Sequence, residues 1–219
     1  MKNISVVIPA RGGSVGIPNK NMMLINNRPL LTYTIEKALN LNADNIYVST
    51  NDEDIKNYVN NNYRNIIIDD RPDELATSAS TMEELISYML GKYNMDILIL
   101  LQPTSPQIDA EYIHKGVLDV LRGYDSALSI YRTDENDVLM WDLDTKIPLN
   151  YDLKNRGNRQ ERKDKYAVET GGFYITTKEQ FITSNCRIGG NISFIEIPFW
   201  QSFEIDEMID ALMIAKLMR

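Results

Sequence analysis

The chain alternates between two hydrophobic patterns from its first residues. Short apolar runs rich in β-branched residues, such as residues 4–8, indicate buried strands. Segments whose apolar residues recur three and four positions apart, such as residues 30–41, indicate helices instead. The pattern predicts strands at residues 4–8, 46–50, 66–69, 97–101, 126–131, 172–176 and 192–197, and helices at residues 30–41, 52–59, 80–93, 109–121, 178–184 and 206–218.

Strands and helices that alternate in this order predict an α/β domain with a mainly parallel sheet. The run at residues 97–101 (ILILL) is apolar throughout, as expected of a central strand covered on both faces. In such sheets, ligands bind at the carboxyl ends of the strands. The loop after the first strand and the loop after residue 101 are therefore expected at the same functional edge.

Local signals set the expected ends of several helices. Ser80 and Glu83 have the S-x-x-E form of a capping box, which opens the helix that runs to about residue 93. The asparagines at residues 60–62 are expected to interrupt the helix that precedes them. The last helix is predicted to be amphipathic, with an apolar stripe formed by Ile209, Leu212, Met213 and Leu217.

Residues 133–168 differ from the rest of the chain. Acidic residues between 134 and 144 precede basic residues between 156 and 165, with little apolar periodicity. An unstructured segment of this length is unusual inside a compact domain unless it has a role. We therefore predict a flap or dimerisation excursion at residues 133–168, with a hairpin near 138–149. Residues 1–132 and 169–219 would form the main domain.

Composition places the 219 residues among ordinary soluble proteins, with 43% hydrophobic and 25% charged residues. The formal net charge of −8 argues against nucleic-acid and acidic-membrane partners, but it leaves room for a small anion held by a few arginines. No apolar run is long enough for a signal peptide or a membrane span. The single cysteine, Cys186, excludes an intrachain disulfide and favours a reducing, cytoplasmic setting.

The first predicted strand ends in a loop rich in glycine and basic residues, IPARGGSVGIPNKN at residues 8–21. Glycines allow the backbone N–H groups to approach an anion, and Arg11 and Lys20 supply positive charge. The spacing matches neither the GxxxxGK[ST] nor the GxGxxG pattern, so two common nucleotide-binding loops are excluded. The loop is interpreted as a phosphate site, and a flexible surface connection is the alternative.

Glu204 and Asp206 lie two positions apart and share a face if their segment is extended. Two hard carboxylates of this kind suit Mg²⁺, which often takes one or two carboxylates together with substrate phosphates. Asp210, one helical turn further on, could support Asp206 or simply belong to a solvent-facing side of the helix. The alternative is that these acids only cap the last helix.

Other chemistry finds little support in the sequence. The single histidine, His114, lies within a predicted amphipathic helix, and no G-x-S-x-G motif is present. The chain also lacks a Cys/His ligand set for zinc. The catalytic means that the sequence does offer are positioning of the substrates, a metal ion and cationic groups that stabilise phosphate. Enzymes that transfer phosphoryl and nucleotidyl groups use these means.

Together, these motifs resemble the acylneuraminate cytidylyltransferases, and the likeness covers nearly the whole chain in order. Its parts are IPARGGSVGIPNKN (8–21), RPDELA (71–76), LQPTSP (101–106), NRQ (158–160) followed by ETGGFYI (169–175), and FEIDEMID (203–210). The resemblance implies a Rossmann-like, GT-A-related nucleotidyltransferase fold. It also implies that the excursion exchanges with a partner subunit in a homodimer.

The resemblance further implies a reaction in which CTP and a nonulosonic acid give a CMP-sugar and pyrophosphate, with Mg²⁺ as cofactor. The catalytic residues implied are Arg11, Lys20 and Asp206. The residues implied for nucleotide binding are Ala10, Arg11, Gly12, Lys20, Asn21, Arg71 and Ser80. Those implied for the sugar acid are Gln102, Arg159 and Tyr174, and those for the metal are Glu204 and Asp206.

The sequence departs from the family pattern at a few positions. Val15 stands where the glycine loop usually has lysine, which supports a second hypothesis of a degenerate nucleotide-binding paralogue with weak or no catalysis. Thr170 replaces an asparagine, and Arg187 and Ile188 fall in a region that is aromatic in some sialic acid enzymes. Legionaminic acid or another nonulosonic acid is therefore an open possibility. A third hypothesis is activation of the shorter sugar acid KDO, although that branch differs in the glycine loop.

Overall fold

The computed structural model describes residues 2–14, 16–132, 139–158 and 166–218. Seven strands of this part form one sheet in the order β5-β4-β1-β6-β8-β7-β9. Neighbouring strands pair in parallel except at β8, which runs antiparallel to both β6 and β7. The strands are β1 (Ile4–Pro9), β4 (Asn45–Thr50), β5 (Ile67–Asp70), β6 (Ile97–Leu101), β7 (Ser126–Arg132), β8 (Ala167–Thr177) and β9 (Ile192–Glu196).

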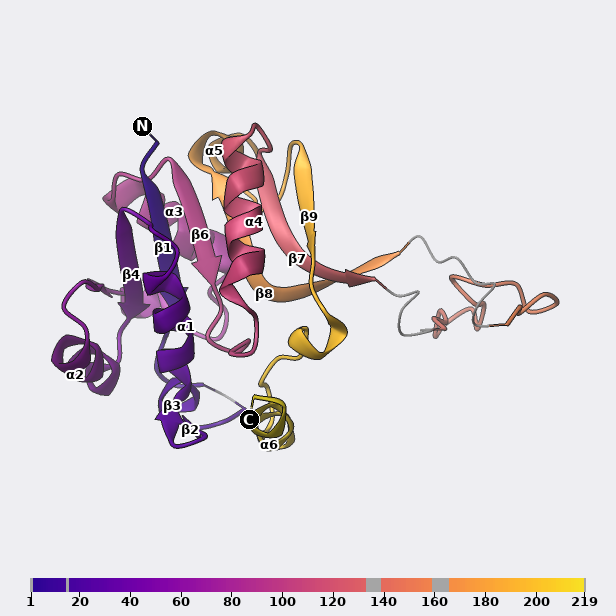
Figure 1. The fold of residues 1–219 in the computed structure, drawn as a ribbon, viewed down its shortest axis with the longest axis horizontal. Helices are drawn as coiled ribbons and strands as arrows, with labels where there is room; N and C mark the ends of the chain where they lie inside the picture. Colours follow the sequence, from indigo (N-terminus) through magenta and orange to yellow (C-terminus); the bar gives the residue numbers. More distant parts are fainter. Residues whose placement is uncertain (1, 15, 133–138, 159–165, 219) are drawn as a thin grey trace.

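Helices cover both faces of this sheet (Figure 1). The helices are α1 (Leu30–Leu39), α2 (Glu53–Asn62), α3 (Met82–Lys92), α4 (Ala110–Leu121), α5 (Lys178–Ser184) and α6 (Met208–Leu217). Helices α1, α2 and α4 pack on one face of the sheet, and α3 and α5 pack on the other. The predicted α/β fold with a mainly parallel, Rossmann-like sheet is thus confirmed. In the described part of the chain, no helix is long and apolar enough to cross a bilayer.

A smaller core lies below the sheet, where the short hairpin of β2 (Leu24–Ile25) and β3 (Arg28–Pro29) meets α6. Asn26 and Asn27 form the turn of this hairpin at φ values of 48° and 66°. Asparagine tolerates this left-handed region better than most residues do, so the two asparagines fit the tight connection. The hairpin leads directly into α1.

The ends of helices α2 and α3 differ from the sequence prediction for local reasons. Helix α2 continues through residues 60–62, which were expected to interrupt it, and Asp52 caps its start by accepting from the N–H groups of Asp54 and Ile55. The capping box of α3 is formed by Thr81 and Glu84, one residue later than predicted. The reason is that the Ser80 hydroxyl donates to the carbonyl of Glu74 at 2.7 Å and stabilises the preceding turn instead.

Strand β8 begins at Ala167, five residues before the strand predicted at residues 172–176. Its first part pairs with β7 from Arg132↔Ala167 to Ile130↔Glu169, and the register then shifts before Leu128↔Tyr174. Gly171, at φ 66°, lies inside this bulge. The strand is therefore longer than predicted, and the two consecutive glycines provide an irregular section within it.

Helix α6 is apolar all round rather than amphipathic. It buries Ala211 and Ile214 against the smaller core. The residues predicted to form its buried stripe are exposed instead: Ile209 by 57%, Leu212 by 59%, Met213 by 48% and Leu217 by 43%. The prediction of the buried face is therefore wrong, because in a helix that is apolar on every side the pattern does not show which side packs.

Residues 139–158 stand away from the main body, beyond the end of β7 and the start of β8 (Figure 1). Within them, the Asp142 N–H donates to the Ile147 carbonyl at 2.9 Å, and Trp141 pairs with Pro148 in an antiparallel bridge. The hairpin predicted near 138–149 is therefore present in its described part, while Val138 lies outside the described residues. We use the name arm for residues 139–158.

Candidate active site

The loops after β1, β4, β5 and β6 meet at one edge of the sheet, where the parallel strands end. The glycine loop after β1 and the start of α2 enclose a hollow of about 250 Å³ at this edge. The hollow is lined by Arg11, Gly12, Asn19, Asn21, Met22, Asp52, Asp54 and Ile55. The sequence predicted a site at this edge, and three of the predicted nucleotide-binding residues line the hollow.

Hydrogen bonds to the neighbouring strand fix the start of the glycine loop. Ala10 is fully buried, and its N–H donates to the Ser49 carbonyl at 2.9 Å. The Gly12 N–H donates to Asn51 Oδ1 at 3.0 Å, and Asn21 Nδ2 donates to the Arg11 carbonyl at 3.1 Å. In this conformation, Asn21 therefore holds the loop in shape.

Two arginines lie close together beside the glycine loop. Arg11 Nη1 donates to the Ala76 carbonyl at 2.9 Å, and Arg71 Nε donates to the Leu75 carbonyl at 2.8 Å. Burial, and secondly the charge of Arg11, lower the pKa of Arg71 to about 10. Among the described residues, neither guanidinium forms an ion pair with a carboxylate. The charge of Asp69 partly opposes the lowering of the Arg71 pKa, but no described carboxylate bonds either guanidinium directly, so the two adjacent cations form a suitable receptor for a phosphate group.

Lys20 joins the glycine loop to the segment before α6. Its ammonium donates to the Ile205 carbonyl at 2.8 Å and lies 3.2 Å from Asp206 Oδ1. A side chain at Gly16 would bring its Cβ within 2.7 Å of the Asp206 carbonyl oxygen, so only glycine fits there without movement. The first and last motifs of the sequence are therefore in direct contact.

Glu204 is partly buried on the same segment, next to the bulge of β8. Burial is the main cause, and the charge of Asp206 the second, of a rise in the pKa of Glu204 to about 7. A Cβ at Gly171 would collide with the Glu204 carboxylate, and its φ of 66° also disfavours any other residue. The bulge thus leaves the space that Glu204 occupies.

The Asp210 carboxylate contacts the backbone of the segment that carries Asp206, and its role in supporting a metal-binding Asp206 stays a prediction. Asp210 Oδ2 accepts from the N–H of Asp206 at 3.1 Å and from the N–H of Glu207 at 2.8 Å. These bonds fix the backbone of the predicted metal-binding segment and cap α6 at the same time. The alternative that Glu204 and Asp206 cap the last helix is not what the structure shows, because Glu207 and Asp210 form the capping box of α6.

Glu204 and Asp206 fit a divalent cation by the chemistry of their oxygens. Burial first and the charge of Asp206 second disfavour the ionised form of Glu204, and a cation beside the two carboxylates would offset both effects. The described residues contain no cluster of three or more His, Cys, Asp or Glu side chains arranged for a metal. The pair therefore suits Mg²⁺, whose remaining ligands are commonly water and substrate phosphates, better than a metal held by protein alone.

Gln102 follows β6, as predicted, and its N–H donates to the Gly172 carbonyl at 3.1 Å. Two residues further on, the Thr104 carbonyl accepts from the Ile205 N–H at 2.9 Å. The loop that carries Gln102 is therefore tied both to β8 and to the segment that carries Glu204. A backbone hydrogen bond thus links the loop of Gln102 to the segment of Glu204 and Asp206.

Tyr174 and Ser80 have contacts that differ from those expected of residues lining an open site. Tyr174 is only 4% exposed, its hydroxyl donates to Glu169, and the Arg187 guanidinium lies 4.5 Å from its ring centre. Burial raises the pKa of the Tyr174 hydroxyl above its ordinary value. Ser80 bonds within the loop between Arg71 and α3. Their assignment to the sugar and the nucleotide stays a prediction.

Two positions discussed from the sequence lie outside the described residues. Arg159 was assigned to the sugar acid by family likeness, and Val15 is the departure in the glycine loop. The structure therefore describes neither their contacts nor their distance from the site.

Sequence reasoning missed Asn51 and Asp52, which directly follow β4. Asn51 accepts the Gly12 N–H and donates to Asp73 Oδ1 at 3.1 Å, so it links the glycine loop to the loop after β5. A Cβ at Gly12 would lie 2.9 Å from Asp52 Oδ2. The sequence did contain a signal for these two residues. They directly follow a predicted parallel strand, so they belong to the same edge of the sheet as Gln102.

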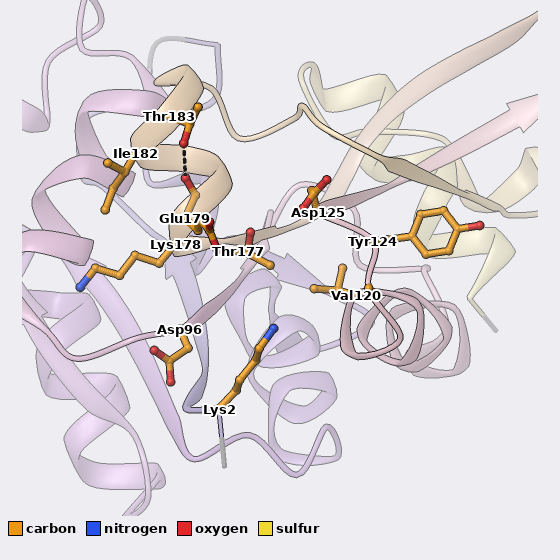
Figure 2. Close-up of a pocket in the computed structure, with 11 residues that line it drawn as sticks. Lys2, Asp96, Val120, Tyr124, Asp125, Thr177, Lys178, Glu179, Ile182 and Thr183 are labelled. Carbon is orange, nitrogen blue, oxygen red and sulfur yellow. Dashed lines mark hydrogen bonds between the residues drawn. The ribbon is translucent and has the colours of Figure 1, made fainter.

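A larger hollow, of about 840 Å³, lies at the opposite edge of the sheet. Figure 2 shows its lining, where side chains come from the amino ends of the parallel strands and from α5. Lys2, Asp96, Asp125 and Lys178 contribute charge to it. None of the predicted site residues lines this hollow, so its size does not make it the candidate active site.

Comparisons with known proteins show which family the chain belongs to. The sequence pattern of a family described as Cytidylyltransferase matches residues 5–183. N-acylneuraminate cytidylyltransferase of Escherichia coli O18:K1:H7 is 29% identical over 216 residues, which cover 94% of this chain and 50% of that protein. Pseudaminic acid cytidylyltransferase of Campylobacter jejuni is 25% identical over 227 residues, which cover 96% of this chain and 93% of that protein. The chain thus spans about half the length of the first relative.

A solved structure shares the fold. CMP:2-keto-3-deoxy-manno-octonic acid synthetase, in complex with CTP, matches with a TM-score of 0.71 at 17% identity, over 98% of each chain. At this identity, the likeness shows a common arrangement of strands and helices.

Proposed function

The chain belongs to the cytidylyltransferase family, which matches residues 5–183, and we propose that it activates a nonulosonic acid with CTP, giving a CMP-sugar and pyrophosphate. The observation that carries this proposal is the pair of Arg11 and Arg71 at the glycine loop. Their guanidinium groups lie close together without a carboxylate partner among the described residues. A polyphosphate would supply the missing negative charge.

In the proposed reaction, the anomeric hydroxyl oxygen of the sugar acid forms a bond to the α-phosphorus of CTP. The bond from that phosphorus to the bridging oxygen of pyrophosphate breaks, and the hydroxyl proton passes to solvent. Arg11, Arg71 and Lys20 would offset the negative charge that shifts onto the leaving pyrophosphate. Gly12, next to Arg11 in the chain, lines the same hollow.

Glu204 and Asp206 would hold Mg²⁺, which would supply positive charge to the phosphates when bound. Lys20 has a supporting role at this position, because its ammonium already lies against Asp206. Asp210 would keep the Asp206 backbone in place through its accepted hydrogen bond. The magnesium assignment rests on this donor set and on the family resemblance.

The sugar end is proposed to lie near Gln102, with Arg159 as the partner of the sugar's carboxylate. Nonulosonic acids are favoured as the substrate class because relatives named for N-acylneuraminate and pseudaminic acid match over 94% and 96% of the chain. The experiment that tests this function combines the purified chain with CTP, Mg²⁺ and, in turn, N-acetylneuraminic, pseudaminic and legionaminic acids and KDO. Pyrophosphate release and the mass of the CMP-sugar are measured.

We expect release only when CTP, metal and a nonulosonic acid are all present. Absence of release with every acid, at high enzyme concentration, would contradict the proposal. Release with KDO alone would favour the shorter sugar acid. A Val15→Lys variant separates the degenerate-paralogue hypothesis: if the natural chain binds CTP without turnover and the variant turns over, that hypothesis is correct.

We further propose that the protein acts as a homodimer through its arm. Five large apolar side chains in the arm are exposed: Trp141 by 44%, Leu143 by 89%, Ile147 by 59%, Leu149 by 57% and Leu153 by 57%. Exposed apolar side chains gathered in this way are typical of protein interfaces. Sedimentation velocity tests the proposal, with a Leu143→Asp variant expected to shift a dimer toward monomer. A natural chain that sediments as a monomer would refute it.

A further inference from the structure

A small internal space lies directly behind the loop that carries Gln102. Its volume is about 10 Å³, which is enough for one water molecule. Helix α1, the loop of residues 102–106, the start of α4 and strand β8 enclose it. The lining residues are Thr34, Lys37, Leu101, Gln102, Ser105, Ile108, Ile113 and Gly172.

Two buried hydroxyl groups line this space without a hydrogen-bond partner among the described residues. Thr34 is 2% exposed and Ser105 is 3% exposed, and both side-chain oxygens are unpaired within the protein. Buried polar atoms are rarely left without a partner, because burial removes their bonds to water. One water molecule in the space would serve both hydroxyl groups.

Lys37 lies one helical turn beyond Thr34 and reaches the same loop. Its ammonium donates to the Ser105 carbonyl at 3.1 Å. The residue keeps some surface accessible, but protein atoms surround the ammonium, and this burial lowers its pKa to about 7 against the opposing influence of Asp109. Lysine ammonium groups are seldom buried, so a lysine that reaches inward to one carbonyl calls for an explanation.

We propose that Lys37 is a positioning residue for the sugar-acid end of the site: its ammonium, together with one internal water held by Thr34 and Ser105, fixes the backbone that carries Gln102. The part that concerns the sugar acid rests on the proposed function. The part that concerns the loop depends on the structure alone.

The bonding of the loop explains why its position matters. The Ser105 N–H is 3.4 Å from the Gln102 carbonyl, which closes a turn around Thr104. The Thr104 carbonyl in turn accepts from Ile205, between Glu204 and Asp206. Lys37 therefore acts on the point where the Gln102 turn meets the acid-bearing segment.

Other hydrogen bonds hold the start of α4, next to the Gln102 loop. They limit how far the loss of the Lys37 bond can disturb the structure. Gln107 Nε2 donates to the Gln201 carbonyl at 3.1 Å, and Gln201 Nε2 donates to Asp109 Oδ2 at 2.6 Å. On α4, His114 Nε2 lies 3.0 Å from the Asn40 carbonyl, near the end of α1. Loss of the Lys37 bond should therefore loosen residues 102–106 without releasing the start of α4.

The decisive measurement is hydrogen–deuterium exchange of the whole chain, compared between the natural protein and a Lys37→Met variant. Methionine fills a similar volume and cannot donate. We expect exchange in the peptide covering residues 101–106 to rise by about tenfold, as for the loss of one charge-assisted hydrogen bond, with β4 unchanged. Lys56→Met, on the surface of α2, is the matched control and should change nothing at the loop. Unchanged exchange at residues 101–106 in Lys37→Met would overturn the proposal.

Kinetics tests the functional part separately. In Lys37→Met, KM for the sugar acid should rise by about tenfold while KM for CTP stays within a factor of two, and Lys37→Arg should recover part of the loss. Equal changes in both KM values would contradict a role specific to the sugar end. If the natural chain has no activity with any sugar acid, the proposed function fails, whereas the exchange result still decides the role of Lys37 in the loop.

The water is tested by a high-resolution crystal structure of the natural protein. We expect one ordered water within about 3 Å of Thr34 Oγ1 and Ser105 Oγ. In a Thr34→Val variant, the water should be lost or displaced while the fold is kept. A dry space in the natural protein would refute this part of the proposal.

Discussion

The ammonium of Lys20 lies 3.2 Å from Asp206 Oδ1, although the two residues are 186 positions apart in the chain. This ion pair joins the glycine loop after β1 to the segment that precedes α6. Lys20 is largely buried, with 15% of its side chain exposed, whereas Asp206 is 74% exposed. The lysine is therefore held in place by the protein, and the aspartate remains accessible to a ligand.

Replacing Lys20 by methionine should lower kcat/KM for CTP by roughly 10²–10³, as when one positioned donor to a developing charge is lost. Initial rates of pyrophosphate release measure the effect. Lys2→Met is the control, because Lys2 lines the hollow at the opposite edge of the sheet (Figure 2). An equal loss of activity in both variants would show that general charge, rather than position, is responsible.

Replacing Asp206 by asparagine should raise the Mg²⁺ concentration needed for half-maximal activity by at least about tenfold, because one anionic ligand is lost. Glu204→Gln should act in the same direction. Activity is measured across a magnesium titration at saturating CTP. Glu179→Gln, in the opposite hollow, should leave the titration curve where it is. A curve unaffected by both site variants would rule out these carboxylates as metal ligands.

Replacing Arg71 by methionine should weaken CTP binding by about 1.5–3 kcal/mol, the typical value of a hydrogen bond to a charged group. Titration calorimetry with CTP measures the change directly and needs no sugar acid. Arg122→Met is the control. The Arg122 side chain is 73% exposed, and its guanidinium lies 3.7 Å from the Asp119 carboxylate. Natural affinity in Arg71→Met would contradict the assignment of Arg11 and Arg71 as a phosphate receptor.

The buried ammonium of Lys37 makes stability depend on pH. Its pKa falls from 10.5 to about 7 on folding, so between these values the unfolded chain binds more protons than the folded chain does. The contribution of Lys37 to stability should therefore rise with pH over this range, by at most about 1.4 kcal/mol per pH unit. Denaturant unfolding of the natural protein and of Lys37→Met, at pH 6.5 to 9.5, measures the difference. A difference independent of pH would show that the ammonium titrates normally.

Patterns confined to one element gave the most reliable predictions of the fold. The apolar run at residues 97–101 is β6 with the same bounds. A strand that is buried on both faces is apolar at every position, so its own residues are enough to predict it. Helix α6 failed for the opposite reason: which side of an apolar helix packs is decided by Ile17, Ile25 and Leu30, far away in the sequence. The start of β8 was missed because two glycines masked a bulge within the strand.

The sequence predicted many residues of the candidate site but not the contacts between them. Loops at the carboxyl ends of parallel strands indicated the edge, and the family resemblance named Lys20 and Asp206. The contact between them, the proximity of Arg11 and Arg71, and the inward direction of Lys37 all depend on tertiary packing. A single sequence contains no local signal for contacts of this kind.

The pairing of Arg132 with Ala167 has a consequence for how this family of folds can vary. Strand β7 ends and strand β8 begins side by side, so the sheet brings the two ends of the connection between them together whatever its length. Doubling a flexible connection adds only about 0.6 kcal/mol to the cost of closing it. The segment between β7 and β8 can therefore change in length without altering the pairing of the sheet.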